Sequence, residues 1–196
     1  MVPALDMNFI VKLLPLVSAL VIYLVRVIEL QTKRQTIAGA IRENITLRFF
    51  IIIGTGMLLG SMAEYLLLKK TISWPFFASG WAVGLFSFYV RRRAIAALGR
   101  FWSLHVEIRD THELVREGPF RWVRHPAYFS MILEILSICL LLRSWYTTVI
   151  VAALFLPTLF TRIRIEENAL IEKFGDAYRQ YRRQVPAIFP YKGPCA

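Results

Sequence analysis

The sequence AYFSMILEILSICLLLRSWYTTVIVAALFLPTLFT at residues 127–161 decides the fold. It contains two apolar runs, 127–142 and 145–161, which are separated only by Arg143 and Ser144. A helix needs about 20 residues to cross a 30 Å hydrocarbon core, with a lower limit of about 17. The two runs therefore predict two membrane-spanning helices that are joined in a tight hairpin.

Three further apolar runs precede this hairpin, at residues 9–30, 49–68 and 74–90. None of the runs alternates apolar and polar residues with period two, which argues against a transmembrane barrel. Hydrophobic residues make up 57% of the 196 residues, above the roughly 45–50% of soluble chains. The two cysteines also exclude a disulfide scaffold. The sequence therefore predicts an all-α, polytopic membrane protein with about five transmembrane helices.

The charges predict the orientation of these helices. The chain carries a net charge of +11, which in a soluble protein would favour a nucleic-acid partner. In a membrane protein the same excess follows the positive-inside rule and favours anionic lipid headgroups. With the N-terminus outside, 19 basic residues lie inside and 3 lie outside. We therefore expect a multi-pass protein with a cytoplasmic C-terminus, in the cell membrane if the source is prokaryotic, and no nucleic-acid partner.

Two polar segments fall on the cytoplasmic side of this topology, and both are too long to be simple connections. The chain is accordingly divided into N-terminal transmembrane helices, 1–90, and a C-terminal catalytic half, 91–196. The second part comprises a cytoplasmic loop at 91–126, the hairpin at 127–161, and a cytoplasmic helix with an extended apolar flap at 162–196. Any chemistry is expected in this half, beside the membrane.

Several charged or glycine-rich patterns in the apolar runs have structural explanations. The sequence GTGMLLG at 54–60 lies inside an apolar run rather than after a strand, so Gly56 and Gly60 are expected to allow close helix packing. Glu64 lies near the end of its run, where it can reach the interface. Glu134 lies in the middle of its run and should face protein or a cavity, as a helix-pairing or a functional group.

The sequence GPFRWVRHPAY at 118–128 combines a Gly-Pro turn with Pro126, which suits the first turn of the helix that follows. An aromatic and arginine belt is the alternative interpretation of this stretch.

The sequence RIRIEENAL at 162–170 places Arg162 and Glu166 on one helix face. They are either a surface ion pair or a site for a charged or zwitterionic ligand. The spacing of His105, His112 and His125 does not suit a metal site.

Both stretches resemble the isoprenylcysteine carboxyl methyltransferase family over roughly the C-terminal half. The matching residues are His105, DTHELV at 110–115, GPF at 118–120, RHPAY at 124–128, Arg162, Glu166, Glu167, Leu170, FG at 174–175, Tyr178, Tyr181 and VP at 185–186. Related phospholipid methyltransferases share the Arg-His-Pro block and the Glu-Glu pair. His105 stands where the family can have Gln, and Phe120 replaces a common Tyr.

The resemblance implies an enzyme that uses S-adenosyl-L-methionine, releases S-adenosyl-L-homocysteine, and methylates the carboxylate of a prenylated cysteine or a similar lipophilic acid from the bilayer. It implies that Arg162 holds the substrate carboxylate and that Glu167 acts with it as a catalytic residue. It also implies a cofactor site without metal, formed by His105, His112, Glu113, Leu114, Val115, Phe120, His125, Pro126, Ala127, Tyr128 and Glu166.

Three other functions remain open at the level of sequence. A phospholipid amine N-methyltransferase could use the same cofactor site, but its amine nucleophile would need deprotonation. A non-enzymatic membrane scaffold or channel would not bind S-adenosylmethionine. A membrane reductase would bind a nicotinamide cofactor instead.

Overall fold

A computed structural model describes residues 7–31, 40–41, 45–102, 107–108 and 114–195 of the chain. Long helices dominate it, and a two-residue antiparallel strand pair joins two of the connecting segments. The elements are α1 (Met7–Gln31), β1 (Ala40–Ile41), α2 (Ile45–Leu67), α3 (Trp74–Leu98), η1 (Gly99–Phe101), β2 (Glu107–Ile108), η2 (Gly118–Arg121), α4 (Pro126–Leu142), α5 (Trp145–Phe174) and α6 (Asp176–Gln184).

Each of the five predicted apolar runs lies in a separate long helix, which confirms the helical membrane fold. By length and composition, three of these helices suffice to cross a membrane, over Ile10–Glu29, Ile45–Leu67 and Trp145–Phe174. Helix α4 is a shorter apolar helix, and α3 is rich in Trp, Gly and Ser, which lower its hydropathy. Helices α3 and α5 continue beyond the predicted runs at 74–90 and 145–161, because helix-forming polar residues follow each run.

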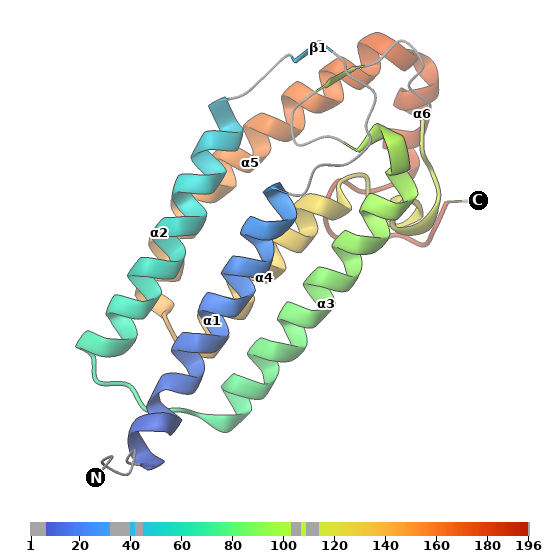
Figure 1. Ribbon diagram of the computed structural model, residues 1–196. Helices are drawn as coiled ribbons and strands as arrows, with labels where there is room; N and C mark the ends of the chain where they lie inside the picture. Colours follow the sequence, from blue (N-terminus) through green and yellow to red (C-terminus); the bar gives the residue numbers. More distant parts are fainter. Residues whose placement is uncertain (1–6, 32–39, 42–44, 103–106, 109–113, 196) are drawn as a thin grey trace.

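The helices lie side by side along one direction, with the α4–α5 turn and the N-terminal end of α1 at one end and α6 at the other (Figure 1). Helix α4 packs on α1, α2, α3 and α5 and so stands at the centre of the bundle. The predicted tight hairpin is confirmed. Arg143 has a φ of 52° and ends α4, and the Ser144 amide donates to the Cys139 carbonyl at 3.1 Å. The polar elements therefore gather at one end of the bundle.

Small residues allow α3 to approach α4 closely. A Cβ atom added to Gly80 would lie 2.9 Å from the backbone nitrogen of Leu141. Ser137 Oγ donates to the Gly80 carbonyl at 2.7 Å. This contact combines a short backbone separation with a buried hydrogen bond, both of which depend on the missing glycine side chain.

The prediction for the glycine motif in α2 is confirmed at one position and wrong at the other. A Cβ atom at Gly60 would lie 2.8 Å from Thr147 Cγ2 of α5, whereas one at Gly56 would meet no atom within 4 Å. Gly56 is exposed because its side of α2 faces away from the bundle.

Glu64 also differs from the expectation that it reaches the interface. It is buried, and its Oε2 accepts hydrogen bonds from the amide and the hydroxyl of Thr147, each at 2.8 Å. Lys70 Nζ donates to Glu64 Oε1 at 2.7 Å. The carboxylate therefore ties α2 to the first turn of α5.

We predict that Gly80→Ala destabilises the protein and that Gly56→Ala does not. The new methyl group at residue 80 would overlap the backbone of Leu141, which should lower the free energy of unfolding by about 1–3 kcal/mol. At residue 56 the methyl group meets open space and favours the helix. Thermal unfolding of both variants in detergent checks this, and equal melting temperatures would contradict the packing described here.

Candidate functional site

A cavity of about 270 Å³ lies at the polar end of the bundle and extends between the helices. Most of the site residues that the sequence predicts contribute to its lining. These are Leu114, Val115, Phe120, His125, Pro126, Ala127, Tyr128, Arg162 and Glu166. Glu167 is not among the lining residues, and the predicted His105, His112 and Glu113 lie outside the described residues.

The local sequence explains how the loop before α4 reaches the cavity. Gly118 has a φ of 57°, a conformation that suits glycine, and it opens the short helix η2 with Pro119 next to it. Pro126 then stands at the first position of α4, as predicted. The chain between these two proline turns carries Arg124 and His125 to the side of α5.

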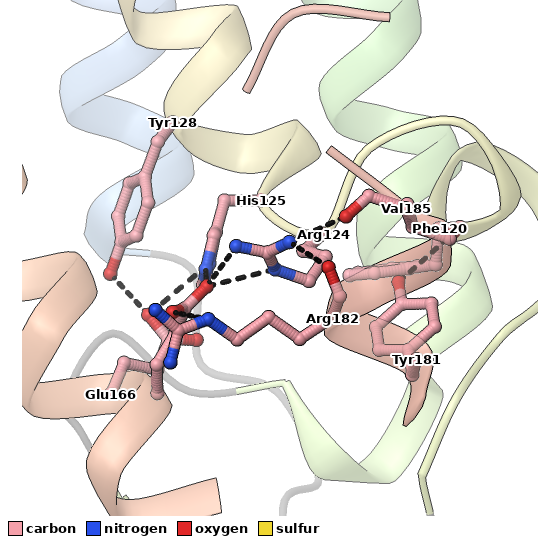
Figure 2. Close-up of polar contacts among 9 residues, drawn as sticks. Phe120, Arg124, His125, Tyr128, Glu166, Tyr181, Arg182 and Val185 are labelled. Carbon is pink, nitrogen blue, oxygen red and sulfur yellow. Dashed lines mark hydrogen bonds and ion pairs between the residues drawn. The ribbon is translucent and has the colours of Figure 1, made fainter. Parts of the chain in front are cut away.

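Tyr128 connects the two predicted charged residues of α5. Its hydroxyl donates to Glu166 Oε2 at 2.7 Å and accepts from Arg162 Nε at 2.9 Å, as the view of the site shows for the first contact (Figure 2). The ring of His125 stacks on that of Tyr128, with centroids 5.5 Å apart. Arg162 and Glu166 therefore act on one site through a shared hydroxyl rather than as a bare surface pair.

Arg162 is 4% exposed although it carries a charge. Its Nη1 donates to Thr46 Oγ1 of α2 at 2.7 Å, and its guanidinium carbon lies 5.9 Å from the centre of the Phe50 ring. The first turns of α2 thus hold this side chain together with Tyr128 of α4. Such bracing fixes the direction of a guanidinium group, which is what carboxylate recognition requires.

Glu167 points toward Arg124 and away from the cavity. Its Oε1 accepts from Arg124 Nε at 2.8 Å and lies 2.7 Å from Arg124 Nη2. His125 Nε2 lies 3.2 Å from the same oxygen, and Arg182 Nε lies 3.3 Å from Oε2 (Figure 2). The Glu167 carboxylate on α5 therefore links α5 to the start of α4 and to α6. The family pattern in the sequence does not reveal this role.

The charge state of Glu167 follows from these contacts. It lies in the part of α5 beyond the apolar residues 145–161. Burial by itself raises the pKa of the Glu167 carboxyl, but the hydrogen bond with His125 and the positive charge of Arg124 together lower it to about 2. The carboxylate is therefore ionised throughout the neutral range, which keeps the junction intact.

The segment that the sequence predicts as an extended flap, 185–191, is anchored at its beginning. The amides of Arg124 and His125 donate to the carbonyls of Pro186 and Ala187, each at 2.9 Å. Val185 and Ile188 are buried, whereas Phe189 and Tyr191 are exposed. The segment forms a fixed strap beside the start of α4, and its exposed part begins at Phe189.

Helix α6 contributes two buried tyrosines to the cavity lining, Tyr178 and Tyr181. The Tyr181 hydroxyl donates to the Phe120 carbonyl at 2.7 Å, which connects α6 to η2 (Figure 2). Burial raises the pKa of both phenol groups far above the ordinary value, so both remain protonated at neutral pH.

Sequence reasoning did not assign Arg26, Arg91 or Arg124 to the site, although all three line the cavity. Glu134 lines it too, and it forms an ion pair with Arg26 at 2.7 Å. The sequence did contain a signal for these residues. Charged side chains inside or at the ends of apolar runs are costly to bury in a membrane and are often functional.

Comparison with known proteins gives consistent matches. The sequence model of the isoprenylcysteine carboxyl methyltransferase (ICMT) family matches residues 81–172. The uncharacterised protein YpbQ of Bacillus subtilis is 34% identical over 119 residues, which cover 58% of this chain and 67% of YpbQ. The protein-S-isoprenylcysteine O-methyltransferase of Schizosaccharomyces pombe is 33% identical over 104 residues, covering 52% of this chain and 44% of the yeast protein.

A solved structure is also similar. It is that of the eukaryotic intramembrane Ras methyltransferase ICMT, with a TM-score of 0.61 and 25% sequence identity. The match covers 76% of this chain and 55% of that structure. This chain therefore corresponds to about half the length of the eukaryotic proteins that it matches.

We predict that Glu167→Gln destabilises the protein most at neutral pH. A carboxylate whose pKa is lowered stabilises the fold above the ordinary value of 4.5, and this contribution is lost as the pH falls toward about 2. Removing one partner of such a buried pair costs about 3–5 kcal/mol. Melting temperatures of the protein and the variant should therefore differ at pH 7 and converge only as the pH approaches about 2.

Glu117 provides the matched control, because it is a glutamate on the exposed surface rather than in the buried junction. Glu117→Gln should follow the unmodified protein across the same pH range. A Glu167→Gln variant that is as stable as this control at pH 7 would refute the structural role of the carboxylate.

Proposed function

Because the chain belongs to the isoprenylcysteine carboxyl methyltransferase family, we propose that it is a membrane methyltransferase that uses S-adenosyl-L-methionine. The proposed acceptor is the carboxylate of a prenylated cysteine or a similar lipophilic acid. One observation carries the proposal. The same cavity contacts Arg162, Tyr128 and Glu166 at its polar end and apolar residues of α1, α2 and α4 further along.

The residues present suit this cofactor. Glu166 lines the cavity with a side chain that is 34% exposed, so its carboxylate is accessible to the ammonium group of a ligand. Leu114, Val115 and Phe120 supply apolar and aromatic walls. S-adenosylmethionine, when bound, supplies an electrophilic methyl group on a sulfonium centre and leaves as S-adenosylhomocysteine.

The chain's own residues need to supply orientation rather than a base. A carboxylate is ionised at neutral pH, so one of its oxygens can attack a methyl carbon without prior proton transfer. Arg162 can bind that carboxylate through two parallel hydrogen bonds if the acceptor replaces part of its present contacts. Holding both reactants in line can lower the barrier by about 7–11 kcal/mol.

The apolar part of the cavity suits the lipid portion of the acceptor. Residues such as Ile22, Met57 and Ile138 come from three different helices and face the same space. A long hydrocarbon group that leaves the bilayer for this space remains in an apolar environment. We further propose that the polar end faces the cytoplasm, since the charge distribution of the sequence favours that orientation.

We predict that Arg162→Lys lowers kcat/KM for a prenylated cysteine about 100-fold and changes cofactor affinity less than about twofold. Lysine keeps the charge but loses the planar pair of donors that matches a carboxylate. The measurement is transfer of labelled methyl groups from S-adenosylmethionine to N-acetyl-S-farnesylcysteine by the protein in detergent. Phosphatidylethanolamine serves as the second acceptor in the same assay.

Each result of this assay has a defined meaning. Transfer to the prenylated cysteine alone supports the proposal, and transfer to phosphatidylethanolamine alone would replace it with amine methylation. The absence of transfer to both acceptors, together with no binding of S-adenosylhomocysteine, would refute a methyltransferase function. An unchanged kcat/KM in Arg162→Lys would refute the role of this arginine.

We predict that Glu166→Gln weakens the binding of S-adenosylhomocysteine about 10-fold to 100-fold. The amide retains an oxygen for the Tyr128 hydroxyl but loses the charge that would bind an ammonium group. Calorimetric titration in detergent measures the dissociation constant. Asp176→Asn is the matched control, because the Asp176 side chain is 93% exposed on α6, and its affinity should not change.

A further inference from the structure

A second hollow, of about 510 Å³, lies on the outer side of α6, between this helix and the C-terminal residues 192–195. It shares no lining residue with the cavity described above. Three of its lining side chains are basic and two are amides, and none of the described lining residues is acidic. The lining consists of Arg116, Gln180, Arg183, Gln184, Lys192, Gly193, Pro194 and Cys195. The hollow is therefore a polar, positively charged space that the proposed methyl transfer does not use.

Helix α6 separates the two spaces, because its two faces differ. Tyr178 and Tyr181 are buried and line the cavity. Gln180, Arg183 and Gln184 are exposed and line the hollow. These three positions are three and four residues apart, so they share one face of the helix.

The wall that faces α6 is held in place by hydrogen bonds. The Cys195 amide donates to the Arg121 carbonyl at 3.0 Å, and Arg121 Nε donates to the Cys195 carbonyl at 2.9 Å. Lys192 Nζ donates to the Arg183 carbonyl at 3.0 Å, which joins the C-terminal residues to α6. The hollow is therefore preformed, which lowers the cost of ordering its walls around a ligand.

The contacts that hold the basic side chains do not neutralise them. Lys192 donates to a backbone carbonyl, and Arg116 Nη2 donates to the Ala177 carbonyl at 2.9 Å. The Arg116 guanidinium carbon also lies 5.6 Å from the centre of the Tyr181 ring. Carbonyl groups and aromatic rings carry no net charge, so both side chains keep a positive charge that an anion can bind.

Two other arginines of α6 have carboxylate partners. Arg179 Nη1 lies 2.8 Å from Asp176 Oδ1, and Arg182 Nε lies 3.3 Å from Glu167 Oε2. Neither arginine lines the hollow. The excess positive charge of this region therefore lies at the hollow rather than along the whole helix.

Aromatic residues next to the hollow indicate its depth relative to the membrane. The C-terminus lies at the same end of the bundle as α6 (Figure 1). The Phe189 ring packs edge-on against Phe129 in the first turn of α4, with centroids 6.0 Å apart. Phe189 and Tyr191 are exposed, and Lys192 Nζ lies 5.8 Å from the centre of the Tyr191 ring. Exposed aromatic side chains at the end of a membrane helix favour the headgroup layer. Lys192, and with it the hollow, is therefore expected at the level of the lipid headgroups.

We propose that this hollow binds the phosphate group of an anionic phospholipid headgroup. Arg116, Arg183 and Lys192 supply positive donors for the phosphate oxygens. The amides of Gln180 and Gln184 can exchange hydrogen bonds with hydroxyl groups of a glycerol-type headgroup. A zwitterionic lipid would place its ammonium group beside the same three cations, which is unfavourable.

The test compares two lipids and two double variants of the full chain in detergent. Native mass spectrometry during a titration gives the dissociation constant of the first bound lipid, for phosphatidylglycerol and for phosphatidylcholine with the same acyl chains. The test variant combines Arg183→Gln with Lys192→Gln. The control combines Arg164→Gln with Arg179→Gln, which removes the same charge from exposed residues that do not line the hollow.

We expect the unmodified protein to bind phosphatidylglycerol about 10-fold more tightly than phosphatidylcholine. Each basic residue beside an anionic headgroup contributes about 5-fold in affinity, so the test variant should lose about 30-fold for phosphatidylglycerol. The control should stay within about twofold of the unmodified protein. Equal affinity for the two lipids, or an equal loss in both double variants, would overturn the proposal.

A soluble phosphate is the other source of the same chemistry. Glycerol 1-phosphate carries the phosphate and the hydroxyl groups without acyl chains. If it binds as tightly as phosphatidylglycerol, the lipid assignment is overturned, and if it binds much more weakly, the assignment is supported. No methyl donor or acceptor is present in these titrations, so their outcome is independent of the proposed function.

Discussion

The buried contact between Glu167 and Arg124 holds together the parts from which the site is built. Glu167 belongs to α5, Arg124 to the segment before α4, and the two residues are 43 positions apart in the chain. Arg124 Nη1 also donates to the carbonyls of Arg182 and Val185, so the same side chain fixes the end of α6 and the strap that follows it. The contact has a positioning role, because the Glu167 carboxylate is not part of the cavity lining, to which Arg124 contributes.

The polar end of the bundle contains many charges in a protein whose outer surface is largely apolar. They are compatible with burial because the carboxylates have specific donors, namely Arg124 for Glu167 and Arg26 for Glu134. Each of these two pairs joins residues that are distant in sequence, 43 positions apart for Arg124 and Glu167 and 108 positions apart for Arg26 and Glu134. The charges therefore both satisfy one another and set the relative positions of the helices.

The apolar runs predicted the number and order of the long helices, because runs of this length and composition have few alternatives to a membrane helix. The Gly-Pro turn, Pro126 at the start of α4 and the hairpin at Arg143 were also readable from local patterns. Contacts between residues that are far apart in the sequence could not be predicted from such local patterns. Glu64 and Thr147 are 83 residues apart, and no local pattern shows that they meet. The packing role expected for Gly56 was wrong, because a GxxxG spacing does not show which of its glycines faces a neighbouring helix. Glu167 could be matched to a family pattern, but that pattern does not show that its side chain points away from the cavity.

The strap has a consequence for the biosynthesis of the protein. Val185, which receives a hydrogen bond from Arg124, is synthesised 61 residues after it. By then the helical hairpin between them has already been made and can enter the bilayer. The strap therefore docks onto helices that are already made, and a nascent chain that stalls before Val185 holds its membrane segments but lacks the carbonyls of Pro186 and Ala187 that accept from the amides of Arg124 and His125.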